Sequence, residues 1–431
     1  MAYTLTNGRV FTGDSLIERG FVSFENGKIT NVGEMSNFHG QSDIDVKGKL
    51  IMPAWVNAHT HIYSTLARGM SVEFHPLSFT QILKQLWWRL DRALTKEEIE
   101  ISAMVAASEF IHSGVATIFD HHSSPSHVRG SLESLKKAIV DRAGMRGIFC
   151  YETSDRDGIQ NEAIEENADF YELHKNDHKV SGMMGLHASL TLSDETLETV
   201  SKVCKGVIPI HVHVAEGVED ELESINKFNL KIIERFEKYG LLDDGAIYAH
   251  CIHVDDDEIE KIAKSGGTIV VNVQSNMNNA VGVPDILRFM SHGVRVAFGN
   301  DGFGFSPSFG MRFLVLTQKH IHKTPLAFSS HELEKMINNN YELAGKHLNE
   351  NFGNIKKGAP ADLIVINYDP PTPMTRDNFY DHLFFGISEA KVISLYVDGK
   401  TVMENEKIKT FDESEVRKES RKIAEKLWER L

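Results

Sequence analysis

The spacing of hydrophobic positions changes along this chain. In its middle part, short apolar runs alternate with stretches that have the three-to-four-residue apolar spacing of amphipathic helices. One such stretch begins after Thr95, where Glu98 completes a capping box. Eight apolar runs are typical of buried strands: 55–57, 116–119, 147–151, 182–186, 207–212, 246–249, 268–273 and 294–299. Alternation of strands and helices indicates a parallel sheet, and eight such units predict an α/β fold of the (β/α)8 TIM barrel type.

The beginning and the end of the chain show short alternating strands and tight turns instead. Residues 20–25 and 28–32 are separated by Asn26-Gly27, a dipeptide that strongly favours a hairpin. Similar strand patterns return at 361–366 and 392–400. We therefore expect the two ends of the chain to meet in one small β-rich domain.

The last segment, 412–431, has charged residues with periodic apolar positions, which predict a terminal amphipathic helix. Together these patterns predict two domains. The small composite β domain would contain residues 1–52 and 355–431, including that helix. The barrel domain, which would carry the chemistry, would span residues 53–354.

Composition narrows the class of protein. The chain has 431 residues and a formal net charge of −15, which disfavours nucleic acid and anionic membranes as partners. Its three cysteines form no CxxC pair, so neither a disulfide framework nor a thiolate metal site is expected. The N-terminal residues lack a signal-peptide pattern, and no apolar run reaches the length of a membrane span. We expect a cytoplasmic protein that acts on a small molecule.

Polar, mostly titratable side chains follow the end of nearly every apolar run. In chain order they are His59, His61, Asp120, His121, His122, Glu152, His187, His211, His213, Glu216, His250, Asn276 and Asp301. In a parallel barrel the carboxyl ends of all strands lie on one face, where active sites form. The pattern therefore predicts a functional site at this face.

Four of these residues are candidate metal ligands. Side chains two apart in a strand share a face, so His59 and His61 can point toward the same ion. With His213 and Asp301 they supply imidazole nitrogen and carboxylate oxygen without thiolate, which suits catalytic zinc or another first-row divalent ion such as iron. Taken singly, the histidines could be solvated loop residues and Asp301 a turn residue.

Six segments in order carry a family resemblance: 50–61, 65–70, 185–189, 213–216, 249–253 and 299–302. They resemble the motifs of the amidohydrolase superfamily, in its mononuclear aminohydrolase branch. Four further segments are similar to those of SsnA-type aminohydrolases: 86–91, 120–122, 150–158 and 274–282. That group is related to guanine deaminase, S-adenosylhomocysteine deaminase and triazine chlorohydrolases. The resemblance extends from about Gly8 to Lys400.

The resemblance implies roles for individual residues. It implies one divalent metal ion, zinc or alternatively iron, held by His59, His61, His213 and Asp301. It implies acid–base roles for Glu216, His250 and Asp301. His187 would face the substrate, and four further substrate-binding candidates are Arg68, His122, Glu152 and Asn276. For Arg68, a solvated or ion-paired role is the alternative.

The activity implied is hydrolytic deamination of a purine-like amino-heterocycle by a metal-bound hydroxide, with release of ammonia. The metal would lower the pKa of its water to about 7. Asp301 and His250 would take the water proton, and Glu216 would pass it to a ring nitrogen. Two alternatives stay open: loss of chloride, an amine or a cyclic amide from a heterocycle, and a non-catalytic metal-binding scaffold.

Departures from the family pattern leave the substrate open. Asn300 stands where relatives usually carry threonine, and the 303–309 loop lacks the common continuation. The role of His121 and the oligomeric state, a homo-oligomer included, are also open. His211 is an extra histidine two residues before His213, and we expect it to fill the barrel interior without a metal role.

Overall fold

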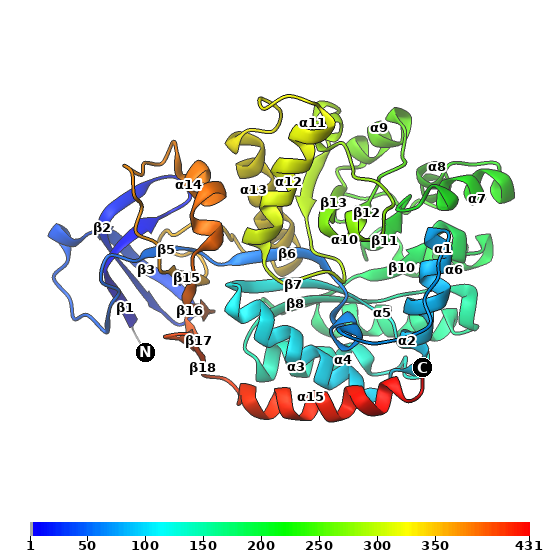
Figure 1. Ribbon diagram of the computed structural model, residues 1–431, viewed down its shortest axis with the longest axis horizontal. Coiled ribbons are helices and arrows are strands. Elements are labelled where there is room, and N and C mark those ends of the chain that lie inside the picture. The colour runs from blue at the N-terminus through cyan, green and yellow to red at the C-terminus, as the bar shows by residue number, and fades with distance from the viewer. Residues whose placement is uncertain (1–2) are drawn as a thin grey trace.

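The computed structural model describes residues 3–431 and places a barrel beside a second sheet (Figure 1). Parallel strands of the barrel form two groups, in the orders β6-β7-β8-β9 and β10-β11-β12-β13-β14. Their bounds are β6 Trp55–Thr60, β7 Val115–His122, β8 Arg146–Tyr151, β9 Val180–Gly182, β10 Met184–Ala188, β11 Ile210–Val214, β12 Ile247–His250, β13 Thr268–Val271 and β14 Arg295–Phe298.

Two seams join these groups into one barrel. Thr60 forms a parallel bridge with Asp301, which connects β6 to the end of β14, and Thr153 forms one with Leu186 on the other side. β9 and β10 are two halves of one strand position, separated at Met183. The structure thus has eight parallel strand positions, which confirms the predicted (β/α)8 barrel.

Two of the predicted strands, 207–212 and 268–273, lose two or three residues at one end. β11 starts at Ile210, because the amides of Val207 and Ile208 both bond to the carbonyl of Cys204 and close a turn. β13 ends at Val271, because the chain becomes helical after Asn272. Asn276, the polar residue predicted to follow the seventh strand, therefore lies on a short helix and not directly at the end of the strand.

Helices cover the outside of the barrel, as Figure 1 shows. The predicted capping box at Thr95 is present and begins α3. The helices around the barrel are α1 Phe79–Ile82, α2 Trp88–Ala93, α3 Lys96–His112, α4 Ser131–Lys136, α5 Gln160–His174, α6 Asp194–Cys204, α7 Val218–Phe228, α8 Ile232–Lys238, α9 Asp256–Ser265, α10 Val273–Asn278, α11 Ile286–Ser291, α12 Pro307–Ile321 and α13 Ser330–Leu348.

The two ends of the chain meet in a nine-stranded sheet. Its order is β18-β17-β16-β15-β5-β1-β2-β3, with β4 paired to β1. The bounds are β1 Tyr3–Phe11, β2 Leu16–Glu25, β3 Lys28–Glu34, β4 Ile44–Asp45, β5 Leu50–Pro53, β15 Leu363–Ile366, β16 Val392–Val397, β17 Lys400–Glu404 and β18 Lys407–Ile408. Glu25 pairs with Lys28 across Asn26-Gly27, whose positive φ values of 51° and 80° confirm the predicted hairpin.

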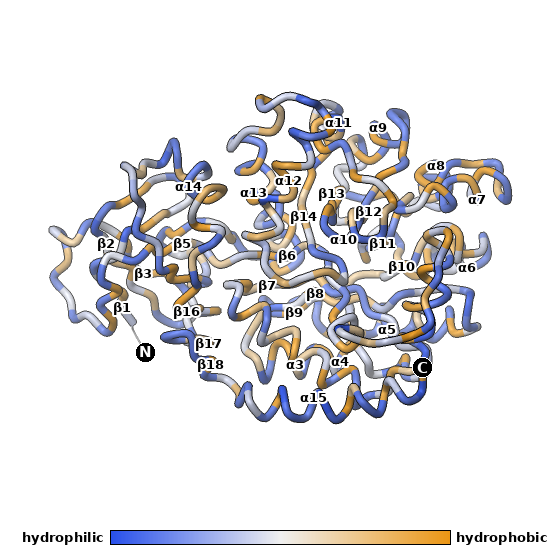
Figure 2. The backbone as a smooth tube through the Cα atoms, in the orientation of Figure 1, coloured by the Kyte–Doolittle hydropathy of each residue, from blue (hydrophilic) through white to orange (hydrophobic). Residues whose placement is uncertain are grey.

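The terminal helix α15, Glu413–Trp428, lies along α3 of the barrel rather than on the nine-stranded sheet (Figure 1). In Figure 2 it is mostly hydrophilic, and its buried positions are Val416, Ile423 and Leu427. Helix α14, Phe379–Phe385, packs against α13. Within residues 3–431 no helix combines the length and the apolar character needed to cross a membrane. The domain boundaries stay a prediction.

Candidate metal centre and catalytic pocket

Four buried side chains from three strand ends converge at the carboxyl face of the barrel. They are His59 of β6, His61 directly after β6, His213 of β11 and Asp301 after β14, and one ligand atom from each lies within 4.8 Å of the others. Nε2 of His61 is 3.0 Å from Nε2 of His213 and 3.1 Å from Oδ1 of Asp301, and Nε2 of His59 is 3.6 Å from Oδ1 of Asp301. Tetrahedral zinc holds neighbouring ligand atoms about 3.4 Å apart.

The polar atoms of this cluster fit a cation. Nε2 of His59 is buried and lacks a hydrogen-bond partner among the described residues. Such an atom costs free energy unless a partner is present. The facing Nε2 atoms of His61 and His213 can both direct lone pairs at one ion. The donor set, three imidazoles and one carboxylate, therefore suits a single divalent metal ion.

Hydrogen bonds on the outer side of each ring orient the three imidazoles. Nδ1 of His61 donates to the carbonyl of His121 at 2.6 Å, and Nδ1 of His213 donates to that of His187 at 2.8 Å. Nδ1 of His59 lies 2.8 Å from Nε2 of another ring. With the proton on Nδ1, each ring presents an Nε2 lone pair to the centre.

Burial sets the charge state of these groups. It lowers the pKa of His59 to about 3 and that of His213 well below its usual value, so both are neutral. Burial also opposes the charge on His61, but Asp301 outweighs it and raises the pKa of His61 to about 9. Metal binding needs the neutral form of His61, so it competes with protonation of this residue.

Glu216 and His250 lie beside the metal ligands. Oε2 of Glu216 is 3.4 Å from Nε2 of His250, and both side chains share a second cluster with Asp301. His250 has a φ of 72°, in the left-handed region that non-glycine residues seldom occupy and that is enriched at functional sites. Burial and the nearby Asp301 raise the pKa of Glu216 well above its usual value, so this carboxyl can carry a proton.

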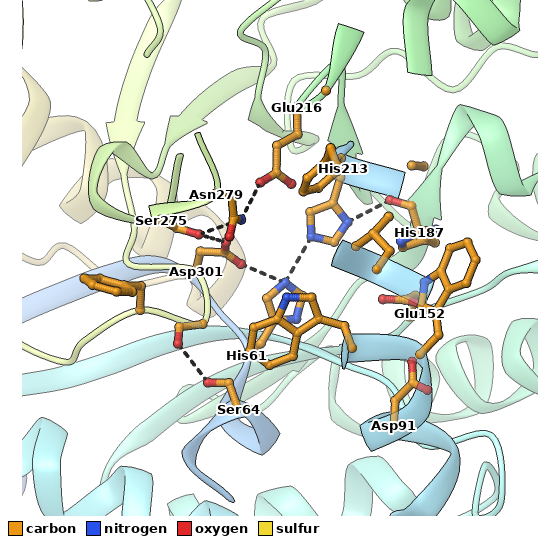
Figure 3. Close-up of a pocket in the computed structure, with 18 of the residues that line it drawn as sticks. His61, Ser64, Asp91, Glu152, His187, His213, Glu216, Ser275, Asn279 and Asp301 are labelled. Carbon is orange, nitrogen blue, oxygen red and sulfur yellow. Dashed lines mark hydrogen bonds and ion pairs between the residues drawn. The ribbon is translucent and has the colours of Figure 1, made fainter. Parts of the chain in front are cut away.

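A cavity that opens to solvent lies above the metal ligands (Figure 3), and its volume of about 850 Å³ includes the solvent space at its mouth. Aromatic and apolar side chains from one segment form part of its wall, namely Phe79, Leu83, Trp87 and Trp88. Residues Leu83–Trp87 form a π-helical turn, a feature that is frequent at functional sites.

Polar groups also line the cavity. His187 and Glu152 were predicted to face the substrate, and both do line it. Asp91 lines it as well, and in Figure 3 Asp91 and Glu152 lie on the other side of His61 from Asp301. The guanidinium of Arg156 bonds to both Asp91 and Glu152.

Three predicted substrate-binding residues lie outside the cavity. The Arg68 side chain is 60% exposed and pairs with Glu109 at 3.4 Å, because the helical turn before it directs the side chain to the surface. His122 is buried and bonds to Ser124, and Asn276 lies behind His250. These three side chains do not line the cavity, and their role in substrate binding stays a prediction.

The sequence pattern did not identify several cavity residues. Ser275 bonds to Asp301, and Asn279, four residues later on the adjoining turn, donates to Oε1 of Glu216 at 3.2 Å. Ser275 and Asn279 are four residues apart, a spacing that places two side chains on the same face of a helix. This spacing was the only signal in the sequence that could have identified them. Trp87, Trp88 and Asp91 were noted only as part of a resembling segment.

Comparisons with known proteins agree with this geometry. A model described as the amidohydrolase family matches residues 50–402. A 5-methylthioadenosine/S-adenosylhomocysteine deaminase of Dictyoglomus thermophilum is 29% identical over 390 residues, 88% of each chain. A 5'-deoxyadenosine deaminase of Methanocaldococcus jannaschii is 29% identical over 417 residues, 94% of this chain and 96% of the relative.

Solved structures share the whole fold. An adenosine deaminase from Xanthomonas campestris with bound zinc superposes with a TM-score of 0.86 at 19% identity, covering 99% of this chain and 98% of that one. An atrazine chlorohydrolase from Arthrobacter aurescens complexed with zinc gives a TM-score of 0.82 at 18% identity, covering 98% and 100%. The resemblance seen in the motifs is confirmed, and this chain belongs to the amidohydrolase family.

Proposed function

We propose that this protein is a metal-dependent aminohydrolase that converts an amino-substituted, purine-like heterocycle and water into the oxo-heterocycle and ammonia. One observation carries the proposal: three members of the metal cluster, His61, His213 and Asp301, line one cavity together with Glu216, which lies 3.4 Å from His250. Relatives at 29% identity over most of the chain are named adenosine-type deaminases, which supports this reaction.

The four-residue cluster would hold one divalent ion, zinc in our proposal, with iron as the alternative. When bound, such an ion supplies Lewis-acid activation, which makes water a nucleophile at neutral pH. Asp301 and His250 would orient the attacking water. The ligand set and the fold-level similarity to zinc proteins support this assignment.

The protein's own acid–base groups would move the proton. Glu216 is buried, and its raised pKa lets it hold a proton near neutral pH. It would donate to a ring nitrogen while the amino-bearing carbon becomes tetrahedral, and a second transfer would release ammonia. Asn279 holds Oε1 of Glu216, so the carboxyl is oriented before substrate arrives.

The cavity wall would hold a planar ring. Trp87, Trp88 and Phe79 offer aromatic surface, and flat heterocycles stack well on such surfaces. Asp91 and Glu152 add carboxylate acceptors for donor groups on the substrate. His187, whose Nδ1 lies 2.7 Å from Oγ1 of Thr191, is the third polar group that we assign to substrate binding.

An ammonia-release screen tests the proposal. Protein stripped with a chelator and then reloaded with zinc is incubated with adenosine, 5'-deoxyadenosine, guanine, pterins and pyrimidines. We expect ammonia from at least one purine-like compound, only in the reloaded protein. Chloride or amine release from substituted triazines, without ammonia from the panel, would favour another leaving group. No release of any group by metal-loaded protein would favour the scaffold alternative.

A further inference from the structure

His211 lies directly behind one metal ligand. It belongs to β11, two residues before His213, and its side chain points into the barrel, where it is almost completely buried. Its Nε2 is 2.8 Å from Nδ1 of His59, and the two ring centroids are 4.9 Å apart. His211 therefore contacts the Nδ1 edge of the His59 ring, the edge turned away from the cluster.

This contact distinguishes His59 from the two other histidines of the cluster. Nδ1 of His61 and Nδ1 of His213 are both held by backbone carbonyls, which can only accept a hydrogen bond. Nδ1 of His59 is held by an imidazole, which can either donate or accept. The tautomer of His59 consequently depends on the tautomer of His211.

Only one of the two proton arrangements lets His59 bind a metal. If Nε2 of His211 donated, Nδ1 of His59 would accept, and the proton of neutral His59 would occupy Nε2, the atom that faces Asp301. If Nε2 of His211 accepts, the proton stays on Nδ1 of His59 and Nε2 offers its lone pair. In the second arrangement His211 carries its own proton on Nδ1.

The surroundings of His211 accommodate that arrangement. Its Nδ1 lies 3.7 Å from Sγ of Cys150, a weak acceptor in the barrel core. Its backbone carbonyl accepts a 3.2 Å hydrogen bond from Nε2 of His121, which also donates to the carbonyl of Leu186. Pairing of β11 with β10 and β12 fixes the backbone on both sides.

We propose that His211 is a positioning residue of the metal centre: it accepts the Nδ1 proton of His59 and so keeps the Nε2 lone pair of His59 directed at the ion. The assignment rests on the metal site of the proposed function but not on its substrate. It also replaces the expectation that His211 only fills the barrel interior.

The test compares an acceptor-free with an acceptor-retaining substitution. His211→Leu keeps an apolar volume without an acceptor, whereas His211→Gln places an amide oxygen near the position of Nε2. Zinc affinity is measured by competition with a chromophoric chelator, and the cobalt(II)-loaded forms are compared by visible absorption. His347→Leu is the matched control, because His347 is a histidine held by the carbonyl of Gly245 away from the cluster.

We expect His211→Leu to weaken zinc binding by about 10- to 100-fold and to shift the cobalt bands, with His211→Gln close to wild type in both. His347→Leu should leave zinc affinity unchanged. Thermal unfolding of the metal-free proteins separates this effect from a general loss of structure. If the leucine variant does not fold, His211→Ala replaces it in the same comparison.

Two results would overturn the assignment. Zinc affinity equal to wild type in the acceptor-free variant means that His211 does not position His59. Equal losses in the Leu and Gln variants mean that the ring matters for packing and not as an acceptor. Wild-type protein that binds neither zinc nor cobalt would overturn the proposed metal centre as well, which keeps the two failures distinguishable.

Discussion

The side-chain amide of Asn276 donates a 2.8 Å hydrogen bond to Nδ1 of His250. A neutral His250 that accepts at Nδ1 carries its proton on Nε2, the atom 3.4 Å from Oε2 of Glu216. Both His250 and Asn276 are fully buried, so water cannot replace this bond. Asn276 therefore orients His250 and fixes its tautomer.

Changing Asn276 should therefore alter catalysis without removing the metal. Asn276→Asp accepts where the amide donated, which moves the proton of His250 to Nδ1. We expect kcat to fall by about 10- to 100-fold, with zinc content unchanged. The reason is that Nε2 of His250 would no longer carry the proton that faces Glu216. Steady-state ammonia release and metal analysis measure the two quantities.

Asn161→Asp is the matched control, since Asn161 is exposed on α5 and does not line the cavity. It should retain the wild-type kcat. An Asn276→Asp variant with full kcat would remove His250 from the proton-transfer step, and one that loses zinc would show that Asn276 supports the metal centre instead.

Glu216→Gln tests the proton shuttle. Glutamine keeps the size and the contact with Asn279 but cannot transfer a proton, so kcat should fall by about 100- to 10,000-fold. KM and zinc affinity should change little, because Glu216 is not one of the four ligand residues. Glu219→Gln, three residues later on α7 and outside the cavity lining, controls for the lost charge. Retained kcat in the glutamine variant would exclude the shuttle.

Spacing predicted that the four candidate metal ligands converge, because it maps directly onto strand geometry. His59 and His61 are two apart on a strand, and the ends of eight parallel strands must meet at one face. The barrel and the four-residue cluster therefore follow from local patterns. The partner of His211 does not, because His59 is 152 positions away and only the closed barrel brings the two rings together.

The cavity wall was harder to predict for a related reason. Trp87 and Trp88 are adjacent in sequence and both line the cavity, at the point where a π-helical turn, Leu83–Trp87, meets α2. The ion pair of Arg68 with Glu109, which agrees with the ion-paired alternative for Arg68, could not be assigned from the sequence because Glu109 belongs to a distant helix. Such contacts depend on tertiary packing, which a single sequence does not display.

The link between the barrel and the nine-stranded sheet can be tested independently of catalysis. Arg146, at the start of β8, is fully buried, and its Nε and Nη2 bond to the two carboxylate oxygens of Asp362 at 2.7 and 3.0 Å. Arg146→Met leaves that carboxylate buried without its cation, so we expect a loss of about 3–5 kcal/mol in the free energy of unfolding. Urea unfolding measures it.

Two further variants show whether that loss of stability comes from the buried charge or from packing. Removing both charges in the Arg146→Met, Asp362→Leu double variant should recover most of the stability, because no uncompensated charge remains. Lys202→Met, in an exposed pair with Glu198, should destabilise the protein far less than Arg146→Met, because solvent screens that pair. A double variant as unstable as the single one would mean that packing of the guanidinium, not its charge, joins the two parts.

The attachment of α15 to α3 should depend on pH through Glu413. Burial alone would raise the pKa of this carboxyl, but hydrogen bonds from Ser108, His112 and Arg417 outweigh burial and lower the pKa to about 2. A folded-state pKa below the unfolded value means that the stabilisation is complete above about pH 5. It is lost progressively as the pH falls toward 2.

Glu413→Gln should therefore lower the thermal midpoint at pH 7, by the equivalent of about 1 kcal/mol, since Glu413 is partly exposed and solvent screens the interaction. The difference from wild type should shrink between pH 5 and pH 3, where the wild-type contribution disappears. Glu415→Gln removes the same charge from the same helical turn but at an exposed position, so its effect should be small at every pH. A pH-independent difference for Glu413→Gln would mean that the glutamine disturbs packing, because only a titrating carboxylate produces the predicted convergence at low pH.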